Sequence, residues 1–307
     1  MSRLKVTLID VGWGDSILIE VIKHNNERTF ALIDSNDSTN LRSTHIFLKR
    51  YFERERIELN SDCLFEFVML SHAHSDHGQG LKGIIGQYGT RNLYYPNSFG
   101  GPIVPDLIRY ARRYPQRINE HRVISCGSYI NDIEDVKFKI LWPESEVSDN
   151  ENNNSIVLLI TLKCINILLT GDIEVNKDVW DRIKNKIPDE VHFLKLPHHG
   201  SKNGSLDEQG ETPLLDKVGS LCKLGISTHI VPYTHPSPEI MKILKEKRFD
   251  YFRTDYNHNV SFITNGEKIS IEYSHQDMVD NVQYRSKFCR KVMIYFKKQV
   301  SRFLSYI

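Results

Sequence analysis

An apolar run, Leu64 to Leu70, leads directly into the stretch Ser71-His72-Ala73-His74-Ser75-Asp76-His77-Gly78. This stretch places three imidazoles and a carboxylate within six positions, which is typical of a metal site. If the strand continues through it, the first two imidazoles and the carboxylate are two residues apart and project from one face. The glycine that follows allows a sharp bend, so the last imidazole can turn toward a second ion. The motif therefore predicts one loop that serves two metals.

The composition is that of a globular protein without a strong overall charge. The chain has 307 residues, of which 40% are hydrophobic, enough for one large domain or two small ones. Its 40 basic and 39 acidic residues nearly cancel, so any nucleic-acid or membrane partner would have to be bound by a local patch. Five scattered cysteines without a C-x-x-C pair favour reduced thiols. Since no secretory signal or transmembrane-length run is visible, we expect a cytoplasmic protein.

Short β-rich runs separated by helical patterns predict a layered α/β domain. The predicted strands are Lys5 to Val11, Ser16 to Val21, Thr29 to Asp34, Leu64 to Ser71, Val136 to Trp142, Ile156 to Leu162, Ile165 to Thr170, Val191 to Leu196, Ile226 to Pro232 and Ser261 to Thr264. The predicted helices are Leu41 to Arg54, Pro105 to Tyr114, Val175 to Lys186 and Pro238 to Lys247, with a weaker pattern from Leu81 to Tyr88. One catalytic domain, residues 1–274, accounts for all of them.

The remaining residues, 275–307, have a different character. Their basic residues are Arg285, Lys287, Arg290, Lys291, Lys297, Lys298 and Arg302, against the acidic Asp277 and Asp280. Apolar residues fall at helical spacing between them, so the segment predicts a basic amphipathic helix. Such a helix can dock on its own domain with a solvated basic face. It can also bind nucleic acid, an anionic membrane, a protein partner or a second copy of the chain.

Polar residues of the kinds that bind metals follow four other predicted strands. They are Asp34, Asp172, the pair His198-His199, and His235. Strand ends that meet at one edge would bring these side chains to the histidine-rich stretch. A carboxylate such as Asp172 can bridge two cations while imidazoles supply the other ligands, which suits zinc, manganese or iron.

Several further motifs carry a family resemblance. They are Asp10-Val11-Gly12-Trp13-Gly14-Asp15-Ser16, Leu32-Ile33-Asp34, Asn152-Asn153-Asn154-Ser155, Leu168-Leu169-Thr170-Gly171-Asp172, Leu196-Pro197-His198-His199-Gly200-Ser201 and His235-Pro236. Together with the histidine-rich stretch, they cover about residues 4 to 265 in order. On these motifs the chain resembles metallo-β-lactamase-fold hydrolases, and most closely the hydrolase domain of ComEC DNA-uptake channel proteins.

The resemblance implies a four-layer αββα sandwich with a dinuclear site at one edge of the two sheets, extended here by the C-terminal amphipathic helix. It assigns His72 and His74 to metal one, Asp76, His77 and either His199 or His198 to metal two, and Asp172 to the bridge. Of the two consecutive histidines, His199 is the favoured ligand. Asp34 would orient a ligand histidine. The cofactors would be two divalent ions, zinc or manganese.

Three departures from the family pattern bear on this assignment. Many relatives have a third histidine on metal one, but the corresponding interval contains only His121. Asn152 and Ser155 occupy that interval in the ComEC-like pattern, which suggests completion of metal one by water or asparagine. Asn36 replaces a usual glycine, and Trp13 replaces a usual glutamine. The tryptophan would reshape the rim of the pocket or cap the core.

The chemistry expected of such a site is phosphodiester cleavage, with nucleic acid, and DNA in particular, as the substrate. A hydroxide between two cations would be the nucleophile, with Asp76 in the catalytic site. The remaining histidine of the 198–199 pair, or His235, would protonate the leaving group. Ser201 and Lys202 lie in a Gly/Ser loop that is a candidate phosphate cradle.

Other interpretations of the same chain stay open. A basic patch could track a nucleic-acid backbone or be a solvated helix face; it comprises Arg109, Arg112, Arg113, Arg117 and Arg122 with Tyr110 and Tyr114. The enzyme could act on a small substrate such as a cyclic nucleotide, a phosphocholine ester or a lactone. In a third interpretation, the chain is a metal-stabilised binding or effector subunit that works through its C-terminal helix.

Overall fold

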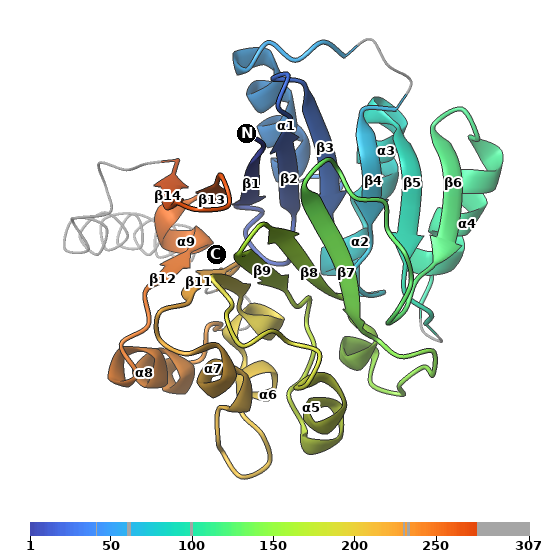
Figure 1. Cartoon of the computed structure of the whole chain (residues 1–307). Coiled ribbons are helices and arrows are strands. Elements are labelled where there is room, and N and C mark those ends of the chain that lie inside the picture. Colours follow the sequence, from blue (N-terminus) through green and yellow to red (C-terminus); the bar gives the residue numbers. More distant parts are fainter. Residues whose placement is uncertain (41, 60–62, 99–100, 230, 232–233, 275–307) are drawn as a thin grey trace, which may run out of the picture.

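A computed structural model of the chain describes residues 1–40, 42–59, 63–98, 101–229, 231 and 234–274 (Figure 1). The basic segment 275–307, with its predicted helix, lies outside these residues. Two β-sheets form the centre of the molecule. Within the described residues, no helix combines the length and the apolar character needed to cross a bilayer.

The first sheet has eight strands in the order β14-β13-β1-β2-β3-β4-β5-β6. Their bounds are β1 Arg3–Leu8, β2 Ile17–Ile22, β3 Arg28–Ile33, β4 Phe65–Met69, β5 Thr90–Tyr95, β6 Ile118–Val123, β13 Val260–Thr264 and β14 Ile269–Tyr273. The pairs from β14 to β3 are antiparallel, and those from β3 to β6 are parallel. The parallel pairs are connected through helices, as parallel strands require.

The second sheet has six strands in the order β12-β11-β10-β9-β8-β7. Their bounds are β7 Val136–Trp142, β8 Val157–Leu162, β9 Ile165–Leu169, β10 Phe193–Lys195, β11 Lys223–Ile226 and β12 Tyr251–Arg253. The strands from β9 to β12 are parallel, and β7 and β8 are antiparallel to their neighbours.

Helices cover the outer face of each sheet (Figure 1). Over the first sheet lie α1 Ser43–Arg54, α3 Leu81–Tyr88 and α4 Ile103–Arg113, and over the second lie α5 Lys177–Ile183, α7 Pro213–Val218 and α8 Pro238–Glu246. A third apolar cluster, which includes Val6, Phe67, Ile160 and Phe193, fills the space between the sheets. The predicted αββα sandwich is therefore confirmed.

Several predicted strands end earlier than expected, and two of these differences bear on the candidate site. Strand β4 stops at Met69, and Ser75–Gly78 forms the short helix α2, so the histidine-rich stretch is a loop followed by a helical turn. The strand predicted from Ile226 onward is β11, which instead ends at Ile226. In both cases the residues of metal-binding type come after the last residue of the strand. Their side chains therefore lie at the edge of the sheet and do not alternate between its two faces.

The parallel strands explain how distant residues meet. Carboxyl ends of neighbouring parallel strands lie at the same edge of a sheet. In the first sheet this places Asp34, after β3, beside the loop after β4. In the second sheet the segments after β9, β10 and β11 share an edge in the same way. The candidate site forms where these two edges face each other.

Candidate metal centre

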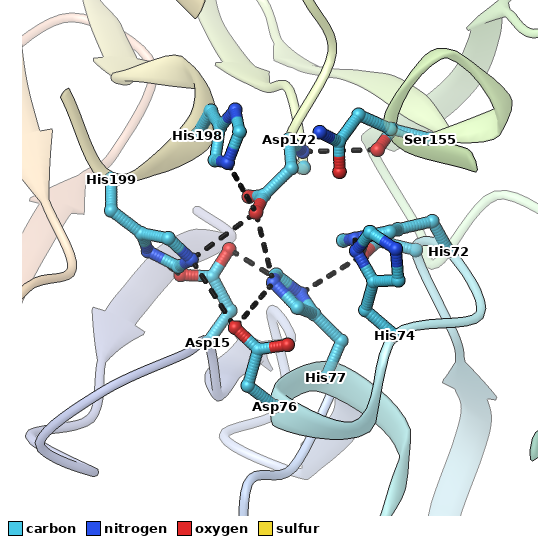
Figure 2. A network of polar contacts seen from close by, with 12 residues as sticks. Asp15, His72, His74, Asp76, His77, Ser155, Asp172, His198 and His199 are labelled. Carbon is cyan, nitrogen blue, oxygen red and sulfur yellow. Dashed lines mark hydrogen bonds and ion pairs between the residues drawn. The ribbon is translucent and has the colours of Figure 1, made fainter. Parts of the chain in front are cut away.

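Four side chains converge between the two sheets. The ligand atoms of Asp76, His77, Asp172 and His199 all lie within 4.8 Å of one another. Oδ2 of Asp172 is 3.3 Å from Nε2 of His77 and 3.2 Å from Nε2 of His199. Figure 2 shows this carboxylate facing the imidazoles of His77, His198 and His199. Of the two consecutive histidines, the structure thus brings His199 into the cluster.

The two imidazoles present one nitrogen each to the cluster. Nε2 of His77 and Nε2 of His199 are buried and make no hydrogen bond within the described residues. Their other nitrogens are held from behind, Nδ1 of His77 by Asp34 at 2.7 Å and Nδ1 of His199 by the carbonyl of Ser227 at 2.8 Å. Since metal-binding histidines usually have such a partner, the four side chains fit a divalent cation.

The charges of the cluster fit the same conclusion. Burial opposes the charge on His77, but the carboxylates of Asp172, Asp34 and Asp76 outweigh it and raise the pKa of His77 well above its usual value. Against the same opposition from burial, mainly Asp172 raises the pKa of His199 to about 9. In the protein alone, protons on His77 and His199 therefore balance the negative charge of the buried carboxylates. A bound divalent cation can supply this positive charge instead.

Asp34 is fixed as a support for His77. Its Oδ1 accepts from the backbone N–H of Ser71 at 2.7 Å, and its Oδ2 accepts from the Ser71 hydroxyl at 2.6 Å. Burial raises the pKa of Asp34, although its ion pair with His77 acts in the opposite direction. The carboxylate thus holds the ring of His77 in one orientation.

Replacing Asp34 with asparagine is expected to weaken divalent-metal binding by about 10 to 100-fold, because the ligand ring loses its charged partner. Isothermal titration with Mn²⁺ or Zn²⁺ measures this change. Asp178→Asn is the matched control, since Asp178 is 79% exposed and pairs with Arg182 at 3.5 Å, outside every group of candidate metal ligands in the described residues. Equal metal affinity for Asp34→Asn and the control would contradict the supporting role.

His72 and His74 form a second pair of candidate ligands. Nε2 of His72 lies 3.0 Å from Nδ1 of His74, so the two nitrogens face each other. The structure does not place them in a group of three or more acidic, histidine or cysteine ligands among the described residues. Burial, followed by the charge on His77, lowers the pKa of His72 well below its usual value, which leaves a neutral ring that can bind metal.

Asn152 presents an oxygen near this pair. It lines the same cavity as His74, and its buried Oδ1 makes no hydrogen bond within the described part of the chain. Its amide nitrogen donates to Oε1 of Glu174 at 2.9 Å, which fixes the oxygen's direction. Ser155 has a different position, because its hydroxyl accepts from the backbone N–H of Asp172 at 3.0 Å and so helps to position Asp172.

A cavity of about 330 Å³ opens beside these ligands. Its lining residues are Trp13, His74, Ser75, Asp76, Asn152, Asp172, His198 and His235. Nε2 of His198 is 4.0 Å from Asp172, and the ring of His198 lies 5.9 Å from that of His235. The two histidines predicted to transfer a proton thus stand together at the cavity, next to the carboxylates.

Lys195 and Asp15 belong to the site although the sequence did not assign them a role. Nζ of Lys195 is fully buried on β10, 2.5 Å from Oδ2 of Asp15 and 3.4 Å from Oδ1 of Asp172. Burial opposes its charge, but these two carboxylates outweigh it and raise the pKa of Lys195. The ammonium therefore holds one oxygen of Asp172, while the other faces the histidines. The feature of the sequence that could have indicated this role is a lysine within the otherwise apolar run Val191 to Leu196.

The loop before β2 packs directly on the metal motif. The backbone N–H of Asp15 donates to the carbonyl of Asp76 at 3.3 Å. A Cβ on Gly14, whose φ is +93°, would lie 2.1 Å from that carbonyl oxygen, whereas one on Gly12, with φ +74°, would meet nothing within 4 Å. Both glycines have a positive φ, but only Gly14 is in close contact with the metal motif.

Gly14→Ala should therefore displace α2 and reduce metal binding, whereas Gly12→Ala should cost only the backbone strain of about 1–2 kcal/mol. Urea denaturation gives the free energy of unfolding of each variant, and elemental analysis after dialysis gives its metal content. If both variants lose the same amount of metal, the contact with Asp76 does not position the motif.

The remaining predicted residues lie apart from the cluster. Ser201 accepts from the backbone N–H of Gly204 at 3.0 Å, as a helix cap does, and Lys202 pairs with Glu239. Neither lines the cavity. His121 is on β6, where its Nδ1 lies 3.0 Å from the Tyr95 hydroxyl.

The basic patch is divided between two elements. Helix α4 carries Arg109, Arg112 and Arg113, and Arg122 is on β6. A hollow of about 850 Å³ on the surface of α4 and α3 is lined by Lys82, Gly83, Asp106, Arg109, Tyr110, Arg112, Arg113 and Tyr114. Lys82 and Arg109 both pair with Asp106, so part of this charge is neutralised.

The two facing sheets, their helical outer layers and the ligand-rich edge resemble those of metallo-β-lactamase-fold proteins. No protein-family model matches the chain. It is 26% identical over 275 residues to ComE operon protein 3 of Bacillus subtilis, across 85% of this chain and 33% of that protein. It is 28% identical over 203 residues to Recombination protein 2 of Haemophilus influenzae, across 66% of this chain and 22% of that protein.

The ComEC-type resemblance is thereby confirmed, although the chain spans only about a third or less of the length of these relatives. Among solved structures, it is similar to the metallo-β-lactamase fold protein YhfI from Bacillus subtilis, with 12% identity and a TM-score of 0.49 over 82% of this chain and 96% of that one. The ligand cluster at the edge of this fold fits a divalent-metal site.

Proposed function

We propose that the chain is a metal-dependent phosphodiesterase that cleaves nucleic acid, with DNA as the favoured substrate. The observation that carries the proposal is the cluster of Asp76, His77, Asp172 and His199, because both of its carboxylates also line a cavity. Carboxylates and imidazoles with an adjoining cavity are the ligand set of a catalytic rather than a closed structural metal site.

The residues present would hold two zinc or manganese ions. His72 and His74, with the Asn152 oxygen, would hold one, Asp76, His77 and His199 the other, and Asp172 would lie between them. When bound, such ions supply Lewis acidity, which lowers the pKa of water and neutralises charge on phosphate oxygens. Lys195 keeps one oxygen of Asp172 away from the ligand side of the site.

Proton transfer to the leaving oxygen would fall to His198 or His235. Burial lowers the pKa of His198, and burial together with His198 and His199 lowers the pKa of His235 to about 4. Both rings are therefore neutral near pH 7 in the protein alone. A phosphate anion bound in the cavity would raise the pKa of the ring that faces it, so the proton becomes available when substrate is present.

Two further observations support nucleic acid as the substrate. Ile103, at the start of α4, packs where a side chain on Gly78 of the metal motif would lie, and the exposed Arg112 and Arg113 end the same helix. They lie about 15 Å beyond Ile103 along the helix axis, on the side that leads away from the motif, where the flank of a long bound strand could reach them. The name of one relative, Recombination protein 2, also points to nucleic acid.

One observation favours a second candidate, the hydrolysis of a small phosphodiester such as a cyclic nucleotide. Among the residues that line the 330 Å³ cavity, none is lysine or arginine. A cavity of this size without a permanent cation fits one nucleotide better than several phosphates.

The cytoplasmic location and the partner-binding role of segment 275–307 stay predictions from the sequence.

The test is a substrate panel with the purified chain and Mn²⁺ or Zn²⁺: single-stranded DNA, duplex DNA, RNA, cyclic nucleotides and bis(p-nitrophenyl) phosphate. We expect cleavage of DNA that is lost in Asp172→Ala and His74→Ala. Cleavage that persists in both variants rejects the site. Turnover of cyclic nucleotides alone selects the second candidate, and no turnover of any substrate favours a binding or effector subunit.

A further inference from the structure

Trp13 stands at the cavity in a fixed position. Its carbonyl accepts from the side-chain amide of Asn36, and the adjoining Gly14 is in close contact with the carbonyl of Asp76. The main chain at Trp13 is therefore held on both sides, which anchors the residue beside the ligand cluster. Trp13 is half-buried, so part of the residue remains accessible.

The indole lies among the imidazoles of the site. Its ring centroid is 4.8 Å from that of His199 and 5.5 Å from that of His235, with the second pair stacked at 30°. Trp13 also lines the cavity together with Asp76 and Asp172. The aromatic face of the Trp13 indole therefore lies directly beside the carboxylates of the proposed reaction site.

The indole surface is suited to bind a planar ring rather than a chain of phosphates. Aromatic side chains bind nucleobases by stacking, and every base has a face for this contact. The cavity lining offers no lysine or arginine as a competing phosphate anchor among its described residues. In a duplex, both faces of a base are covered by its neighbours, so only an unstacked base can pack on an indole beside the metal ligands.

We infer that Trp13 forms a nucleobase subsite next to the metal centre, so the substrate is a nucleotide whose base is unstacked, in a single strand or at a frayed end. This inference rests on the proposed function and names its substrate class. It also gives a role to the residue at which the chain departs from the glutamine of its family pattern.

The experiment compares two 5′-labelled oligomers, dT12 and a twelve-residue strand of the same backbone with abasic residues. Wild type with Mn²⁺ should cleave dT12 in preference to the abasic strand and to a twelve-base-pair duplex. Trp13→Leu should reduce the dT12-to-abasic ratio of kcat/KM by about 10-fold, the loss of one stacked base. Trp13→Phe should retain most of the ratio, and Trp180→Leu, a change in a partly buried tryptophan on α5, should retain all of it.

The outcomes separate this inference from the proposed function. A Trp13→Leu variant that loses activity on both oligomers equally would show a structural role and overturn the subsite. If wild type cleaves neither oligomer, the phosphodiesterase proposal fails for nucleic acid, and anisotropy with Mn²⁺ decides the subsite. Tighter binding of dT12 than of the abasic strand, abolished by Trp13→Leu, would then support it, and equal or absent binding would overturn it.

Discussion

Asp172→Asn is expected to lower kcat/KM by at least about 100-fold, because even a residue that only supports a metal ligand contributes about 10 to 100-fold. Oδ2 of Asp172 lies closest to both buried imidazole nitrogens of the cluster. Asparagine keeps the shape of the side chain but removes the negative charge. Metal content after dialysis should fall together with activity.

The matched control for this variant is Asp178→Asn, since Asp178 is 79% exposed and lies on α5 outside the cluster. It should leave kcat/KM and metal content within the error of wild type. Full activity of Asp172→Asn with a full complement of metal would mean that this carboxylate does not bridge the site, and the ligand assignment would be wrong.

Lys195→Met is expected to destabilise the protein in EDTA by about 3–5 kcal/mol, the usual result of removing one partner from a buried ion pair. Methionine replaces the four-carbon stem of the lysine side chain but leaves Asp15 and Asp172 without the ammonium that lies 2.5 and 3.4 Å from them. Urea denaturation of the metal-free protein gives the free energy of unfolding.

Two comparisons sharpen this result. Lys223→Met removes a lysine from the neighbouring strand β11, where it pairs with Asp250 near the surface, and should cost no more than about 1 kcal/mol. The double variant Asp15→Asn, Lys195→Met should recover part of the loss, since one unpaired carboxylate is gone. Equal destabilisation by the two lysine variants would contradict a special role for Lys195.

The sequence predicted the parts of the molecule in which side-chain chemistry and strand pattern agree. Apolar runs that end in Asp34 and Asp172 correspond to buried strands, so both the sheets and the residues at their edge could be expected. Strands β5, β6, β12 and β14 were missed. Strand β6 is an edge strand with mostly exposed residues, so its sequence Ile118–Val123 shows no alternation between an apolar and a polar face.

The partners of the candidate ligands were harder to foresee than the candidate ligands themselves. Lys195 looks like an interruption of an apolar strand, and only the packing of the two sheets shows that Asp15 lies 2.5 Å away. The choice between His198 and His199 also depends on the fold. Both residues have left-handed φ angles, 48° and 55°, which no simple repeat in the sequence predicts.

The candidate ligands are divided between two distant parts of the chain: His72, His74, Asp76 and His77 follow the first sheet's β4, and Asp172 and His199 follow β9 and β10 of the second. Neither half possesses a complete coordination shell. Ion binding would consequently link the N-terminal and C-terminal halves. Its free energy would add to the free energy of unfolding, so the two halves would unfold together. A chain cut in the loop between β6 and β7 should regain metal affinity only when its two fragments reassociate.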